Sequence, residues 1–172
     1  MKKQNSATKI AYPAILGALS LVFIYIASMV PSGNWGFVAI AGLFPAAAVI
    51  SVSLPSGILC WVGASVLAFL LIPSKFCALL YSVLFGLYPI VKALIERLHK
   101  NMICYLLKLI FFNAAFTLIY VIMRAVVLDS LPSALHAVWL IYVVGNIVFL
   151  AYDFGFSRLI SFYIARIGRA VK

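Results

Sequence analysis

Hydrophobic residues run in long stretches along this chain, and short polar or Pro- and Gly-containing breaks separate them. A membrane-crossing helix needs about 20 predominantly apolar residues. Six crossings and their loops therefore use the whole chain, which predicts an all-α, polytopic integral membrane bundle of six transmembrane helices in a single domain, 1-172. The expected helices cover residues 10-30, 35-54, 57-72, 76-95, 102-128 and 136-157, with a basic amphipathic tail over 158-172. No internal repeat is evident.

Composition excludes a soluble domain. Hydrophobic residues make up 67% of the chain and charged residues 9%, too few charges to cover the surface of a water-soluble fold. The net charge of +10 does not indicate nucleic-acid binding, because the cations form small groups at segment ends and no single basic stripe.

The placement of Lys and Arg predicts the orientation. With both termini in the cytoplasm, only Lys75 and Arg124 lie on the outer side, which agrees with the positive-inside rule for the bacterial cytoplasmic (inner) membrane. The cations expected on the cytoplasmic side are Lys2, Lys3, Lys9, Arg97, Lys100, Arg158, Arg166, Arg169 and Lys172. Arg158, Arg166 and Arg169 share a helical face, typical of an interfacial, snorkelling end to the last helix.

Polar and aromatic side chains fall in stripes on the last three predicted helices when residues are placed at 100° per step. The stripes are Tyr81, Phe85, Tyr88, Lys92 and Glu96; Asn113, Thr117, Tyr120 and Arg124; and Trp139, Tyr142, Asn146, Phe149 and Asp153. Such stripes can line a small-molecule cavity. They can equally pack a core in which a few polar groups hold helices together.

Depth along the helices suggests specific pairs. Lys92 and Asp153 lie equally far from the inner ends of their helices, which predicts a structural ion pair; a proton or ion relay is the alternative. Asn113 and Asn146 are also matched in depth, so they either bond each other or form the floor of a pocket. Lys108 lies on a different face from Asn113, and we expect it to snorkel toward the cytoplasm.

Several residues are candidates for substrate binding. Arg124 continues the Tyr120 stripe and suits bidentate binding of a carboxylate or phosphate, although pairing with Asp129 or snorkelling would also explain it. Trp35 and Trp139 could instead belong to an interfacial belt. The full set of candidates is Trp35, Lys75, Tyr81, Asn113, Tyr120, Arg124, Trp139, Tyr142 and Asn146.

The sequence does not indicate an enzyme, a cofactor or a metal site. Its only carboxylates, Glu96, Asp129 and Asp153, are far apart and at different predicted depths, so no pair could perform acid–base or metal chemistry. No phosphate-binding glycine loop is present. The cysteines, Cys60, Cys77 and Cys104, are expected on both sides of the membrane, which argues against a disulfide or metal framework.

Small residues on the first predicted helix suggest a docking surface. Ala14 and Ala18 form a small-xxx-small face, which serves either a partner or intramolecular packing. The chain resembles the S components of energy-coupling-factor (ECF) transporters in this alanine face, in its length and in its six helices. The stretches 41-48 and 84-97 are also similar to those of S-component-like proteins. The resemblance implies docking through Ala14 and Ala18 onto a T subunit driven by two ABC ATPases. It also implies an outward-opening pocket formed by helices four to six, with residues 31-36 as a lid.

The resemblance therefore implies capture of a vitamin-like solute. Lys75 and Arg124 suggest that this solute has an anionic group, and the aromatic candidates suggest that it has a flat ring. The first alternative is a non-transporting membrane scaffold similar to the rod-shape protein MreD. A second alternative is a subunit of a larger secondary transporter. We expect no inverted repeat and no broken helices in matching halves, which counts against this second alternative.

Overall fold

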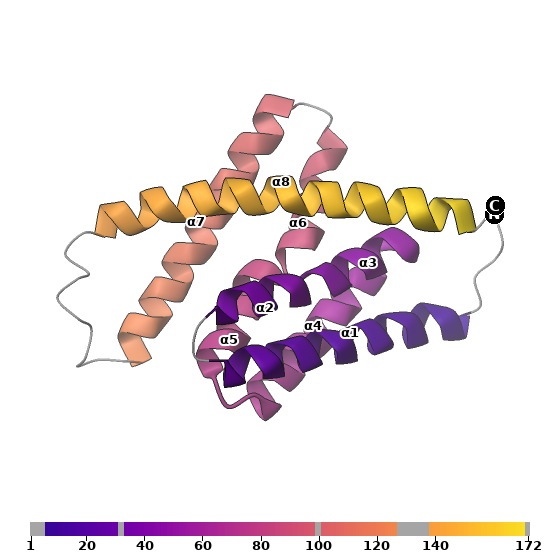
Figure 1. Cartoon of the computed structure of the whole chain (residues 1–172), viewed down its shortest axis with the longest axis horizontal. Helices are drawn as coiled ribbons and strands as arrows, with labels where there is room; N and C mark the ends of the chain where they lie inside the picture. The colour runs from indigo at the N-terminus through magenta and orange to yellow at the C-terminus, as the bar shows by residue number, and fades with distance from the viewer. Residues whose placement is uncertain (1–5, 31–32, 99–100, 127–137, 171–172) are drawn as a thin grey trace. The chain divides into compact units, whose positions relative to one another are not determined.

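The computed structural model describes residues 6–30, 33–98, 101–126 and 138–170, and all regular secondary structure in these ranges is helical (Figure 1). Six helical segments within these ranges are long and apolar enough to cross a membrane. They are Lys9–Met29, Asn34–Ser51, Leu54–Leu71, Lys75–Leu98, Met102–Ala125 and Tyr142–Arg166. The prediction of an all-α protein with six helical segments long and apolar enough to cross a membrane is thus confirmed for the described residues.

The chain forms two compact units, Met1–His99 and Lys100–Lys172, and each is described by itself. The first unit contains the first four spans, and the second contains the last two. The first unit is built from α1 (Ser6–Met29), α2 (Asn34–Ala41), α3 (Leu43–Ser51), α4 (Leu54–Leu71), α5 (Lys75–Leu80), the π-helix η1 (Tyr81–Phe85), α6 (Tyr88–Ile95) and the 3₁₀ turn η2 (Glu96–Leu98).

Helix α1 is central to the first unit, because it packs against α2, α3 and α4. Small side chains line these contacts. Gly17 faces the carbonyl oxygen of Cys60 and the Cβ atom of Ala64, and Ala48 is fully buried beside Leu16. In a bilayer, helices associate through this kind of close packing, since lipid tails are as apolar as the side chains.

The second and fourth spans each contain an interruption of the α-helical hydrogen-bond pattern, although we expected regular helices, and we call them the broken spans. The backbone at Gly42, Gly86 and Leu87 stays in the right-handed helical region. The second span is interrupted between α2 and α3 at Gly42, and the fourth passes through η1 between α5 and α6. Proline explains both positions. Pro45 and Pro89 have no N–H group to donate to the carbonyls of Ala41 and Phe85, four residues earlier.

Side chains of α1 and α4 donate hydrogen bonds to backbone carbonyls near these interruptions. The Ser20 hydroxyl of α1 donates to the carbonyl oxygen of Ala41 at 3.1 Å. The Trp61 indole of α4 donates to the carbonyl oxygen of Ser82 at 2.9 Å. Inside a bilayer no water can take this role, so a broken helix requires such protein donors.

A repeated motif, not recognised in the sequence analysis, marks both breaks. Gly42-Leu43-Phe44-Pro45 and Gly86-Leu87-Tyr88-Pro89 have the same Gly-Leu-aromatic-Pro pattern. We expected no broken helices in matching halves, and in the described residues both interruptions lie in the first unit, while α7 and α8 are continuous. The two broken spans lie in one unit and each follows a straight helix, so they do not form the inverted arrangement typical of secondary transporters.

The second unit is a hairpin of α7 (Asn101–Val126) and α8 (Val138–Ala170). Figure 1 draws α8 as one unbroken helix, and its 33 residues correspond to about 50 Å, longer than the hydrocarbon core of about 30 Å. The predicted boundary at Ser157 is therefore not a helix end: the basic tail continues α8 to Ala170. Within this continuation the Arg166 guanidinium lies 5.6 Å from the centre of the Phe162 ring.

Candidate functional site

The polar chemistry of the second unit lies along the seam between α7 and α8. From one end of the seam to the other, the contacts join Thr117 to Tyr142, Asn113 to Asn146, Phe112 to Phe149, and Lys108 to Asp153. The residue numbers fall on α7 while they rise on α8, so the helices are antiparallel. Between the polar pairs, the rings of Phe112 and Phe149 stack with their centres 4.4 Å apart.

Asn113 and Asn146 bond each other reciprocally. The side-chain nitrogen of Asn113 donates to Oδ1 of Asn146 at 2.9 Å, and that of Asn146 donates to Oδ1 of Asn113 at 3.1 Å. Each nitrogen also donates at 2.8 Å to a carbonyl one turn earlier, that of Leu109 or Tyr142. Each amide therefore uses both of its N–H groups, and only the oxygens keep accepting capacity. The sequence left open whether the two asparagines bond each other or form the floor of a pocket, and in the structure they bond each other.

Replacing Asn113 with Ala should destabilise the hairpin by about 1 kcal/mol, the upper part of the range measured for polar contacts between membrane helices. The double-mutant cycle with Asn146→Ala should give a coupling energy of about 0.6–1.7 kcal/mol. Equilibrium unfolding in mixed detergent measures both quantities. Additive single effects would contradict the mutual bond.

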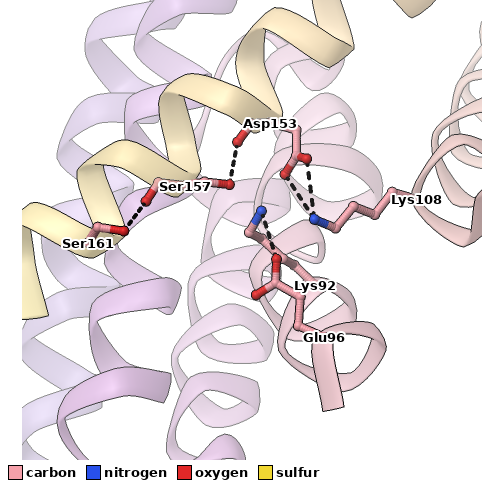
Figure 2. A network of polar contacts seen from close by, with 6 residues as sticks. All are labelled: Lys92, Glu96, Lys108, Asp153, Ser157 and Ser161. Carbon is pink, nitrogen blue, oxygen red and sulfur yellow. Dashed lines mark hydrogen bonds and ion pairs between the residues drawn. The ribbon is translucent and has the colours of Figure 1, made fainter. Parts of the chain in front are cut away.

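Lys108 and Asp153 form a buried ion pair (Figure 2). The Nζ atom of Lys108 lies 3.3 Å from Oδ2 and 3.5 Å from Oδ1 of Asp153, and both residues are almost completely buried. The expectation that Lys108 snorkels was wrong. Lys108 lies one helical turn before Phe112, and the ring of Phe112 stacks on Phe149 of α8. The face of α7 that carries Lys108 and Phe112 therefore also faces α8, beside the face that carries Asn113.

Lys92 pairs with Glu96 on the same helix turn in the first unit. The distance from Nζ to Oε1 is 3.1 Å, the lysine is buried and the glutamate is exposed (Figure 2). The proposed pair of Lys92 with Asp153 would join residues of the two units, and it stays a prediction.

An exposed polar row continues from the asparagine pair toward the far end of α7. The Thr117 hydroxyl donates to the carbonyl of Asn113 at 2.7 Å and lies 2.8 Å from the Tyr142 hydroxyl. Tyr120 is half-buried and Arg124 is exposed on the same row. The side chain of Trp139 and the residues Asp129 and His136 lie outside the described part of the protein.

The remaining binding candidates lie in the first unit. Trp35 is half exposed, with its ring centre 6.1 Å from that of Phe76. Tyr81 is completely buried. The Nζ atom of Lys75 donates to the carbonyls of Phe69 and Ile72 at 2.6 and 3.2 Å, so this ammonium group caps the end of α4. Capping by a cation that follows a helix C-terminus is a role the sequence analysis missed.

Ala14 and Ala18 are exposed on α1, whereas Gly17 is buried against α4. The small residue that serves packing inside the first unit is thus Gly17. The two alanines remain on a surface with other exposed residues such as Ile15 and Val22.

No protein-family model, curated protein or solved structure matches this chain. Among the described residues, no group of three or more His, Cys, Asp or Glu side chains is placed to hold a metal ion. A functional proposal therefore rests on three features of the structure: the α7–α8 seam, the polar row beside it, and the exposed alanines of α1.

Proposed function

We propose that the protein is the substrate-binding S component of an ECF-type ABC importer in the bacterial cytoplasmic (inner) membrane, with both termini in the cytoplasm. It would capture a vitamin-like small solute with an anionic group and an aromatic ring at the outer face. A T subunit and two ABC ATPases would drive delivery into the cell.

The exposed polar row on α7 is the observation that carries this proposal. Thr117 lies about 22 Å along the helix from Met102, the start of the span, and is therefore within the hydrocarbon thickness. The Thr117 hydroxyl makes its hydrogen bonds inside the hairpin, which offsets the cost of its place at this depth, and its exposure leaves it accessible to a solute. The row ends at the exposed Arg124, whose guanidinium suits the carboxylate or phosphate of a solute.

The exposure of Ala14 and Ala18 supports the docking part of the proposal. A pair of alanines four residues apart allows the backbone of a second helix to approach closely. In the S-component interpretation that helix belongs to the T subunit.

One observation favours a second candidate function, a non-transporting scaffold resembling MreD. Asn113 and Asn146 use all their amide N–H groups within the hairpin, as expected of a sealed helix pair. A scaffold needs no cavity, and its polar groups serve helix association alone.

The test is purification of the full chain in mild detergent, followed by native mass spectrometry and melting curves with a panel of vitamins. We expect one vitamin-like molecule per chain. Arg124→Ala should weaken its binding by about 10- to 100-fold, because a hydrogen bond to a charged group contributes about 1.5–3 kcal/mol. The matched control is Arg158→Ala, which removes an exposed arginine from α8 and should leave binding unchanged. Recovery of lipid alone, with no compound raising the melting temperature, would favour the scaffold.

A further inference from the structure

The two copies of the Gly-Leu-aromatic-Pro motif meet inside the first unit. A Cβ atom on Gly42 would lie 2.5 Å from the carbonyl oxygen of Phe85, the residue that precedes Gly86. Each copy follows a straight helix that donates one side-chain hydrogen bond into the broken span, Ser20 into the second and Trp61 into the fourth. In both cases the donor and acceptor are 21 residues apart in the sequence.

The two copies differ in their hydrogen-bond register. The N–H of Gly42 donates to the carbonyl of Val38, four residues earlier, at 3.2 Å, as in an α-helix. The corresponding N–H of Gly86 donates to the carbonyl of Tyr81, five residues earlier, at 2.7 Å. The same motif thus occurs in this protein once in the α register and once in the π register. Isolated π turns inside α-helices are rare and occur often at functional sites.

The Trp61 indole uses one of the two lone pairs of the carbonyl that would be the acceptor in the α register. In that register the N–H of Gly86 would donate to the carbonyl of Ser82, and this oxygen accepts from the Trp61 indole. Gly86 is packed to suit the π register, since a Cβ atom there would lie 2.8 Å from Cδ1 of Trp61 and 2.9 Å from the carbonyl oxygen of Tyr81. The Trp61 bond and the absence of a Cβ atom at position 86 therefore both favour the π turn.

The sequence of α6 fits either register. Removing the π turn would rotate α6 by about 100° and move each residue into the place of the next one along the chain. Val91 would then take the buried place of Lys92, and Leu94 that of Ile95. Lys92 would move to the half-buried place of Ala93. In the second register apolar residues would fill the buried places now held by Lys92 and Ile95, and a charged group would leave burial.

We propose that the fourth span is a register switch: η1 and a regular α-helical turn are alternative states, and the Trp61–Ser82 hydrogen bond holds the π state. Breaking this bond turns α6 about its axis and changes the burial of Lys92. This device is independent of whether the protein binds a solute.

The test is a distance measurement in the full chain reconstituted in nanodiscs. Spin labels are attached through encoded keto amino acids at Ile58 on α4 and at Arg97 in η2, which directly follows α6; both residues are exposed, and the second register would move Arg97 to the exposed place of Leu98. A rotation of about 100° moves a side chain that lies 5–6 Å from the helix axis by about 8 Å. Pulsed electron resonance should show one main distance in the parent protein. In Trp61→Phe and Gly86→Ala it should show a second population, displaced by up to about 8 Å.

The control is Gly63→Ala, which adds a Cβ atom to α4 where no atom lies within 4 Å, and it should keep the parent distance. Gel filtration and melting curves identify the folded variants. If Trp61→Phe does not fold, Gly86→Ala still tests the proposal with the indole in place. A folded Trp61→Phe or Gly86→Ala protein with only the parent distance would overturn the register switch.

Discussion

Lys108→Met should destabilise the protein by about 3–5 kcal/mol, the usual effect of removing one member of a buried ion pair. The carboxylate of Asp153 would lose the ammonium group that lies 3.3 Å away while remaining buried. Desolvation makes such a carboxylate far more costly in the hydrocarbon region than at an aqueous surface. Equilibrium unfolding in mixed detergent, monitored by circular dichroism, measures the difference.

The double variant Lys108→Met, Asp153→Leu should recover most of this loss, because an apolar pair of similar volume is often as stable as the buried ion pair it replaces. Lys9→Met is the matched control. Lys9 is exposed at the start of α1, and its replacement should change stability by less than about 0.5 kcal/mol. A double variant as damaged as the single one would contradict a mainly structural role for the pair.

Gly42→Ala should destabilise the first unit by about 3 kcal/mol, the upper end of the usual cost of overpacking. The added Cβ atom would lie 2.5 Å from the oxygen and 3.0 Å from the carbon of the Phe85 carbonyl. These are backbone atoms, so no side-chain rotation can relieve the clash, and the two broken spans would have to separate. The melting temperature in nanodiscs measures the effect.

Gly63→Ala serves as the control for Gly42→Ala because both add one methyl group to a helical segment. Gly63 is exposed on α4 with nothing within 4 Å of the added atom, so Ala should be neutral or stabilise by up to about 1 kcal/mol. Equal melting temperatures for the two variants would show that the contact between Gly42 and Phe85 is not a tight one.

Part of the α7–α8 seam could be predicted from helical periodicity. Asn113 and Asn146 lie on the predicted polar stripes at matching depth, and in the structure their side-chain amides form hydrogen bonds of 2.9 and 3.1 Å. The partner of Asp153 within its hairpin was not predicted. A stripe drawn at 100° per residue places Lys108 away from Asn113, but α8 faces a surface of α7 wide enough to include both rows. A long lysine side chain can moreover reach across such a surface.

The broken spans were not predicted from the sequence. Gly and Pro were interpreted as punctuation between helices, and the same residues inside the second and fourth spans were passed over. The matching spacing in 42–45 and 86–89 was visible in the sequence. The meaning of that spacing depends on tertiary contacts: Ser20 donates to the Ala41 carbonyl, which Pro45 cannot satisfy, and Trp61 donates to the Ser82 carbonyl.

The sequence by itself determined the all-helical class and the number of spans. In hydrocarbon each segment must satisfy its own backbone hydrogen bonds, so local composition and length are sufficient to identify a helix. Only the tertiary structure decided which groups pair where a helix cannot satisfy its own polar atoms. Ser20 and Trp61 donate to backbone carbonyls of the broken spans, and Lys108 pairs with Asp153. These outcomes depend on contacts between residues that are 21 to 45 positions apart, and helical periodicity within one segment carries no information about them.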